Sequence, residues 1–571
     1  MSKKQVFVFG ISCLLSALSF SQSRYDVLIH EIMADPTPVV GLPAVEWIEL
    51  VNRSGVPISL AGWKLRDRTS TSGAFPDFTL EPGQLVLLGS STTATVMAGY
   101  GPIIPVPSFP SLDNESDLIS LLDPSGQTIH AVAYSVNTYK SEIKRSGGWS
   151  LEMIDRQFPC TGPANWQAST HPTGGTPGQP NAAAGVMVDT EGPRITNTHM
   201  EGDQILHIQF NEPLDSTRSV ARENIQLPAG FSLINIRLSP PLFDQLEIEI
   251  YPAPEPGKME ELTLNHIRDC RQIPIAPMTI VRWGRPVIPS LHDLVINEIL
   301  FNPRSGGSDY IEIYNRSTQV FDARELYLAN RKENGEAGTP YPLRTESRLI
   351  FPGEYWVVTT DSQALIRDHW VKNADRITEL SQLPSFPADK GHVLLLHQQG
   401  TILDEVNYDE DWHSPLVNDP RGISLERIDP NGPSQDPMNW HSAATTSRGG
   451  TPGYRNSQSI ESGTGGEEFW IEPVIISPNN DGFHDHSTIS YQLAEPGQLA
   501  HIRIFDQDGR MVRFLVNTEI TGRTGTWTWD GLGDGRKILP SGNYIVWAEF
   551  LTLQGKRKRF RRLISVVRGY P

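Results

Sequence analysis

Four glutamates set in short apolar runs are the residues of this sequence best suited to chemistry. Glu31 and Glu49 lie in VLIHEIMADP and EWIELVNRS, and Glu298 and Glu312 lie in VINEILFNP and DYIEIYNRS. Two carboxylates brought together can form a glycosidase-like pair or hold a metal ion. The other interpretation, which we favour, is structural: each carboxylate accepts hydrogen bonds at a sheet edge, because an unpaired charge among apolar residues is costly. The pairing geometry that separates the two cannot be read from sequence.

Known catalytic motifs do not fit the chain. His30-Glu31 begins like the zinc motif HExxH, but position 34 is alanine and the run has the pattern of a strand. The sequence contains no GxSxG, no GK[ST] phosphate loop and no GxGxxG after a strand. These absences argue against an enzyme.

The loop NNDGFHD at residues 479–485 is a second candidate site. Asn479, Asp481 and Asp485 offer oxygen atoms at alternating positions around Gly482, an arrangement that can wrap a hard cation such as calcium. The loop lacks the full EF-hand set and its bidentate glutamate, so an Asx-rich turn that bonds its own backbone explains it equally well. Calcium is the one cofactor for which the sequence offers ligands.

The elements that carry the glutamates have the two-residue period of β-strands. In residues 46–54, Ile48 and Leu50 point to one face, and Trp47, Glu49 and Val51 point to the other. The NRS that follows predicts a turn, since asparagine favours chain reversal. Many short apolar runs bounded by Pro, Gly, Asn and Asp predict an all-β chain.

The chain contains a duplication. Residues 46–54 recur as residues 309–317, and the correspondence extends in order through the flanking runs. The matching positions are Glu31 and Glu298, Pro82-Gly83 and Pro352-Gly353, Tyr134 and Tyr408, Trp166 and Trp440, and Thr176-Pro177-Gly178 and Thr451-Pro452-Gly453.

Both copies resemble the lamin tail domain. The resemblance rests on an E-I strand, an E-W/Y-I-E strand, a G-W turn, P-G before an apolar strand and a terminal GGTPG. It implies an immunoglobulin-like β-sandwich that binds or scaffolds rather than catalyses. The second copy departs from the pattern where Glu325-Leu326 replaces Gly62-Trp63, so its packing around that turn and its ligand surface are expected to differ.

Two further modules show other resemblances. The segment between the copies resembles bacterial Ig-like spacer modules, through FNEPLD at 210–215 and NIQL at 224–227. The C-terminal segment resembles the FlgD-like or gliding-motility-type Ig-like modules of Bacteroidetes-type exported proteins, through SPNNDG, WDG and PSGNY. The expected division is a signal peptide at 1–21, a first lamin tail domain at 25–183, an Ig-like domain at 187–286, a second lamin tail domain at 290–456, a flexible linker at 457–468 and a FlgD-like domain at 469–567.

Charge and cysteine content restrict location and partners. A formal net charge of −18 argues against nucleic acid as a partner. Lys3 and Lys4, followed by an apolar run, indicate a cleaved signal peptide, after which no stretch is long and apolar enough to span a bilayer. Cys160 and Cys270 fall in different modules, and we expect two isolated thiols.

The sequence therefore predicts tandem immunoglobulin-like β-sandwiches in a secreted protein that is periplasmic, on the cell surface or extracellular. We expect a non-catalytic structural or binding role with protein or glycan partners. The alternative is a secreted hydrolase, or a nuclease or phosphatase accessory protein, with a cryptic carboxylate site. The oligomeric state is left open.

Overall fold

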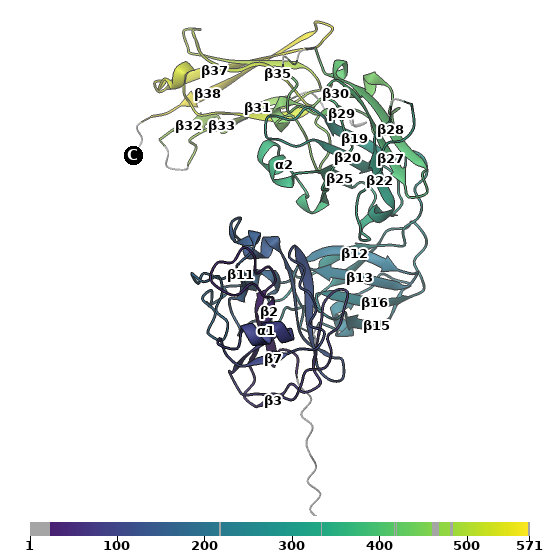
Figure 1. Cartoon of the computed structure of the whole chain (residues 1–571). Helices are drawn as coiled ribbons and strands as arrows, with labels where there is room; N and C mark the ends of the chain where they lie inside the picture. Colours follow the sequence, from purple (N-terminus) through teal and green to yellow (C-terminus); the bar gives the residue numbers. More distant parts are fainter. Residues whose placement is uncertain are drawn as a thin grey trace, which may run out of the picture.

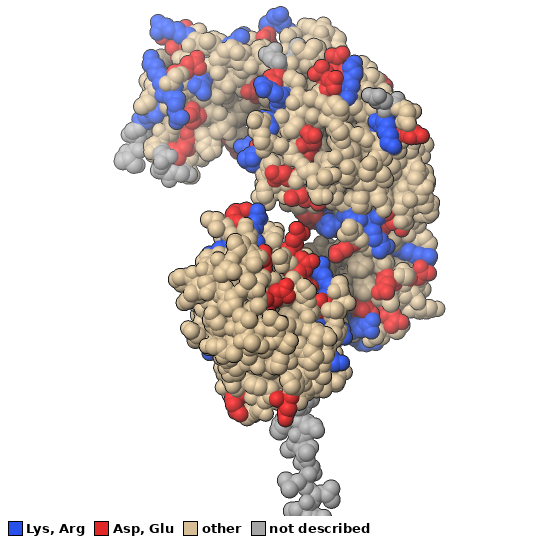
Figure 2. All heavy atoms as spheres, in the orientation of Figure 1, with Lys and Arg blue, Asp and Glu red and all other residues tan. Residues whose placement is uncertain are grey.

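The computed structural model describes residues 23–215, 219–332, 334–415, 417, 419–459, 468–479 and 483–568. The expected signal peptide lies outside these residues. Strands dominate, and the buried apolar residues separate into four main clusters, each enclosed by its own sheets. The protein is thus an all-β string of immunoglobulin-like sandwiches, as predicted. Figure 1 shows the chain following an open curve from the first copy to the C-terminal module, and Figure 2 shows the hollow on the inner side of that curve.

The first copy packs a six-stranded sheet on a three-stranded one. The strand that carries EWIELVNRS is buried on both faces, because the sandwich core covers one face, and Met33, Leu42, Trp47, Leu87 and Met97 pack on the other beside α1 (Ser91–Val96). The large sheet has the order β11 (Trp166–Ala168), β10 (Leu151–Met153), β1 (Val27–Met33), β2 (Trp47–Asn52), β6 (Leu85–Gly89), β7 (Ile103–Pro105); the smaller has β4 (Lys64–Arg66), β8 (Ser116–Leu122), β9 (Thr128–Ser135); β3 (Ile58–Ser59) pairs with β5 (Thr79–Leu80).

The second copy repeats this plan. Tyr134 and Tyr408 are both buried, and each donates its hydroxyl to a backbone carbonyl at 2.8 Å, that of Asp113 or Pro387. The large sheet has the order β26 (Ile377–Glu379), β25 (Tyr355–Thr359), β20 (Tyr310–Asn315), β19 (Leu294–Leu300), β29 (Leu425–Arg427), β30 (Trp440–Ser442); the smaller has β23 (Tyr341–Pro342), β22 (Leu326–Ala329), β27 (Lys390–His397), β28 (Ile402–Asp409); β21 (Phe321–Asp322) pairs with β24 (Leu349–Ile350), and α2 is Ser362–Asp368.

At the turn where the two copies differ in sequence, both copies place an apolar side chain in the core. Gly62 has a φ of +82°, which favours glycine, and it directs Trp63 into the core. In the second copy a short 3-10 turn, capped by the Asp322 side chain, delivers Leu326 to the core instead. A smaller apolar side chain therefore replaces the tryptophan without loss of the strand.

The other two modules are also sandwiches. The intervening module has sheets β12 (Ile195–Glu201), β13 (Ile205–Phe210), β16 (Gln245–Tyr251), β15 (Ser232–Leu238) and β14 (Ile225–Gln226), β17 (Glu260–Leu264), β18 (Thr279–Trp283). The C-terminal module has β31 (Glu468–Glu472), β33 (Ser487–Gln492), β36 (Thr524–Trp529) and β32 (Ile475–Ile476), β38 (Arg557–Val566), β37 (Gly542–Leu551), β34 (Leu499–Phe505), β35 (Met511–Ile520).

Two expectations from sequence are wrong. Cys160 and Cys270 are not isolated thiols: they form a disulfide between the first copy and the intervening module, with Cα atoms 6.1 Å apart. The segment from residue 457 does not begin as a flexible tether, because Gln458 is fully buried and donates its backbone N–H to Glu426 Oε2 at 2.9 Å. The rest of the expected linker, residues 460–467, lies outside the described part of the chain.

Candidate functional site

A β-bulge positions the candidate glutamates in each copy. The register between β1 and β2 shifts between Ile29 and Glu31, so His30 is the extra residue and Glu31 pairs with Glu49. In the second copy the same shift falls between Ile296 and Glu298. A bulge re-aims side chains, and here it turns the side chain of the extra residue towards the neighbouring glutamate.

In the first copy the carboxylates bind the loop that carries Thr176-Pro177-Gly178. Glu31 Oε1 accepts the backbone N–H of Thr176 at 2.8 Å and the hydroxyl of Ser150 at 2.5 Å. Glu49 Oε2 accepts the backbone N–H of Gly178 at 2.6 Å, and its Oε1 lies 3.1 Å from His30 Nδ1. The loop thus covers the carboxylates and supplies their donors.

The second copy repeats the contacts with the loop, and Glu298 Oε1 also accepts the hydroxyl of Tyr310 at 2.8 Å, at the position where the first copy has Trp47. Glu298 Oε1 accepts the backbone N–H of Thr451 at 2.8 Å, and Glu312 Oε2 accepts that of Gly453 at 2.7 Å. Asn297 stands where the first copy has His30, and its Nδ2 donates to Glu312 Oε1 at 2.8 Å.

Each cluster contains a third glutamate that sequence reasoning missed. Glu152 pairs with Glu31 across β10 and β1, and Glu426 pairs with Glu298 across β29 and β19. Glu152 accepts from Thr176 Oγ1 at 2.9 Å, and Glu426 from Thr451 Oγ1 at 3.0 Å. The available signal was the recurrence of glutamate in WSLEMID and ISLERID, at matching places in the two copies.

All of these carboxylates are sealed from solvent. The residues Glu31, Glu49, Glu152, Glu298, Glu312 and Glu426 have 0% relative exposure. Their strands are interior to the six-stranded sheets, so the expectation that the glutamates sit at a sheet edge is wrong. A substrate could reach them only if the overlying loop opened.

Burial and mutual repulsion raise the pKa of several of these glutamates. Burial, aided by the nearby Glu152, raises the pKa of Glu49 to about 8. Burial, aided by Glu298, raises the pKa of Glu426 to about 8 and that of Glu312 well above its usual range. Burial lowers the pKa of His30 to about 4, so its imidazole is neutral at neutral pH. The clusters therefore hold protons that the same residues would lose in water.

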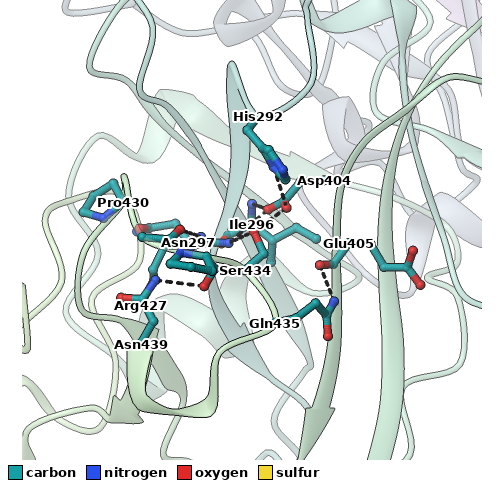
Figure 3. Close-up of polar contacts among 12 residues, drawn as sticks. His292, Ile296, Asn297, Asp404, Glu405, Arg427, Pro430, Ser434, Gln435 and Asn439 are labelled. Atoms are coloured by element: carbon teal, nitrogen blue, oxygen red, sulfur yellow. Dashed lines mark hydrogen bonds and ion pairs between the residues drawn. The ribbon is translucent and has the colours of Figure 1, made fainter.

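The backbone N–H of the residue just before the bulge has a different acceptor in each copy. The backbone N–H of Ile29 donates to His130 Nδ1 at 2.9 Å, whereas that of Ile296 donates to Asp404 Oδ2 at 2.8 Å. Asp404 forms a buried ion pair with Arg427 at 3.0 Å, and Ser434 donates its hydroxyl to Asp404 Oδ1 at 2.5 Å (Figure 3).

The first copy has no counterpart of Arg427 or Ser434 in this network. Met153 of the first copy matches Arg427, since each directly follows a cluster glutamate. Cys160 matches Ser434 by equal spacing from Trp166 and Trp440. The second copy thus has an internal polar network at the place where the first copy has a cysteine that links it to the next module.

The predicted calcium loop is described only in part. Asp481 lies outside the described residues. Asn479 donates its backbone N–H to Asp485 Oδ1 at 3.0 Å, a contact that joins the two described ends of the loop. The calcium assignment stays a prediction.

A groove of about 990 Å³ runs between the second copy and the C-terminal module. It is lined by Trp370, which is 52% exposed, and by Lys372, Tyr454 and Arg523 among others. Among the described residues that line it, none is acidic, although the whole chain carries a net charge of −18. The Arg448 guanidinium lies 5.5 Å from the Trp370 ring centroid, which adds a further cation at its rim.

Residues 21–135 and 289–410 match the family model of the Lamin Tail Domain. Each copy therefore contains a segment that matches the lamin tail domain. The two segments lie in the two sandwiches that share the bulge and the glutamate cluster. No curated protein matches the chain.

Solved structures show only distant likeness. FlgD from P. aeruginosa is 20% identical, with 14% of this chain and 62% of that chain covered and a TM-score of 0.13. PorZ, described as a surface component of the type-IX secretion system of Porphyromonas gingivalis, is 13% identical, with 80% and 56% covered and a TM-score of 0.16. A Ca²⁺-stabilised ice-binding adhesin of an Antarctic bacterium is 9% identical, with 96% and 100% covered and a TM-score of 0.12. The chain spans less than two thirds of the FlgD and PorZ structures, and TM-scores of this size indicate no common overall arrangement.

Within the described ranges, no helix has the length and apolar character needed to cross a bilayer.

Proposed function

We propose that this is an exported, non-catalytic structural or binding protein that acts at the cell envelope or outside the cell. The observation that carries the proposal is the burial of every candidate carboxylate beneath a loop whose backbone amides occupy its oxygens. We assign these glutamates the structural role of anchoring the loop. A catalytic carboxylate must instead reach its substrate within hydrogen-bond distance.

Export is supported by the cysteine pair. A disulfide between two modules persists in oxidising compartments and is rare in a reducing cytosol. The C-terminal module would then serve in sorting or attachment, in line with its resemblance to modules of Bacteroidetes-type exported proteins.

The groove beside Trp370 is the proposed ligand surface. An exposed tryptophan offers an apolar face for stacking on a sugar ring, and Lys372 and Arg523 would attract acidic groups. The ligand class that this lining fits best is an acidic glycan, with a protein surface of similar chemistry as the second candidate.

Binding of the mature chain to immobilised alginate and to neutral dextran tests this proposal. We expect binding to alginate that weakens by about tenfold or more in a Trp370→Ala, Lys372→Ala variant. Tyr251→Ala removes an aromatic ring that is 60% exposed on the intervening module, and as a matched control it should bind normally. Hydrolysis of glycans, phosphate esters or DNA by the purified chain would favour the hydrolase or nuclease and phosphatase alternatives.

A further inference from the structure

The junction between the first copy and the intervening module is braced by several contacts. The Cys160–Cys270 disulfide crosses it. Arg271 donates from its Nη2 to the carbonyl of Met187 at 2.9 Å, and its guanidinium lies 3.8 Å from the ring centroid of Phe158. The connecting segment is therefore held against both modules rather than left free.

Three carboxylates converge at this junction from separate parts of the chain. Asp189 lies in the connecting segment, Glu212 follows β13, and Asp269 immediately precedes Cys270. One oxygen atom from each lies within 4.8 Å of those from the other two. Leu214 forms an isolated β-bridge with Asp269, which fixes the loop after β13 beside the turn that carries Asp269.

The cluster has a buried oxygen without a partner. Asp269 is 1% exposed, and although its Oδ1 accepts the backbone N–H of Ile273 at 2.8 Å, its Oδ2 accepts no hydrogen bond from the described residues. Glu212 is also buried, at 8% exposure. An unsatisfied carboxylate oxygen at this depth is costly unless a cation or another donor reaches it.

The nearby cations do not neutralise the cluster. Within the part of the chain that is described, no ion pair joins Arg194 or Arg271 to any of the three carboxylates, and Arg194 pairs with Glu191 instead. The three like charges therefore destabilise one another as they stand.

We infer that Asp189, Glu212 and Asp269 form a calcium site that fixes the segment entering the intervening module to two of that module's loops. Oxygen ligands without histidine or cysteine select a hard divalent cation. Two ligands on opposite sides of a calcium ion lie about 4.6 to 5.2 Å apart, so oxygen atoms within 4.8 Å of one another can share one calcium ion. The ion would join the connecting segment to two loops of the intervening module, next to the disulfide.

Calorimetric titration and thermal unfolding of the full mature chain, stripped with EDTA and then supplied with CaCl₂, test the site. The Asp189→Asn, Glu212→Gln variant should lose one equivalent of calcium and the calcium-dependent rise in unfolding midpoint. Without calcium it should be at least as stable as the wild type, because two repelling charges are removed. Glu191→Gln, whose side chain is 74% exposed nearby, is the matched control and should retain the site.

The single variant Asp189→Asn replaces only the half-buried ligand of the cluster. It provides the test if the double variant does not fold. It should weaken calcium binding by about tenfold or more. The Asp485→Asn variant distinguishes this site from the loop at 479–485. Any calcium bound by that loop should be lost in this variant, while the junction site should still bind calcium. Equal calcium stoichiometry and affinity in the wild type and the Asp189→Asn variant, or no calcium binding by the wild type, would overturn the inference.

Discussion

His30 Nδ1 lies 3.1 Å from Glu49 Oε1 inside the first lamin tail copy, and the second copy has a different residue at this contact. In the second copy the equivalent partner is the amide of Asn297, which can only donate at Nδ2. A neutral imidazole can donate or accept at Nδ1, depending on its tautomer. Glu49 and Glu312 therefore differ in the side chain that faces their Oε1 atoms.

This difference predicts unequal effects of removing the charge. Glu49→Gln should be tolerated, because neutral His30 can accept from the new amide. Glu312→Gln should lose about 1–3 kcal/mol more, since its amide would face Asn297 Nδ2, which is also held by Asn456 Oδ1 at 2.7 Å. Urea unfolding of the two single variants checks this, and the second copy proving the more tolerant would contradict it.

The raised glutamate pKa values predict a stability that falls with rising pH. Glu49 and Glu426 have pKa values of about 8 in the fold, against about 4.3 in the unfolded chain. The folded state thus binds more protons, and the stability contributed by each group is lost as pH rises through about 8. The lowered pKa of His30 acts in the opposite sense only below about pH 6.5.

The free energy of unfolding should therefore decrease between pH 7 and 9, a window clear of the histidine contribution. Urea titrations at pH 7, 8 and 9 measure it. In Glu49→Gln the decrease should be smaller. A stability that is flat or rises across this window would show that the clusters are ionised in the fold.

The buried Arg427–Asp404 pair should be replaceable by the residues of the first copy. Arg427→Met alone should cost about 3–5 kcal/mol, because it removes the guanidinium that pairs with the fully buried Asp404 and leaves only His292, at 3.3 Å, as a possible cation. Adding Asp404→His restores an acceptor for the Ile296 N–H, as His130 provides for Ile29, and should recover most of the loss. A double variant no more stable than Arg427→Met would show that the copies are not interchangeable here.

Removing the inter-module disulfide should loosen the junction. The bond joins residues 110 apart, and Cys160→Ser, Cys270→Ser should lower the stability of the bonded modules by about 2–4 kcal/mol. Denaturant unfolding in calcium-free buffer measures the loss. Mild reduction of the wild type should reproduce it, and a transition unaffected by reduction would contradict the assignment.

Much of the fold followed from local patterns in the sequence. The two-residue alternation located the strands, and the repeated order of Tyr134, Trp166 and their counterparts established the duplication. The alternation did not reveal that Trp47 is buried as fully as Ile48, because on the second face of the sheet Trp47 packs with Leu42 and Met97 from other parts of the copy. Burial of that kind depends on tertiary contacts rather than on the strand itself.

Less of the candidate site than of the fold could be predicted from the sequence. Glu31 and Glu49 attracted attention because they interrupt apolar runs, but the bulge that aligns them with Glu152 depends on cross-strand register. The Cys160–Cys270 bond likewise depends on how two modules meet, which no motif encodes. Spacing within one module could not have predicted it.

The central claim is that the buried glutamates hold the covering loops and do no chemistry. It is tested most directly by measuring thermal unfolding, alginate binding and hydrolytic activity together in Glu49→Gln and Glu312→Gln. The account predicts a lowered midpoint in Glu312→Gln, a smaller change in Glu49→Gln, and no hydrolysis by either variant or by the wild type. Hydrolysis by the wild type that disappears in either variant while its midpoint stays unchanged would contradict it.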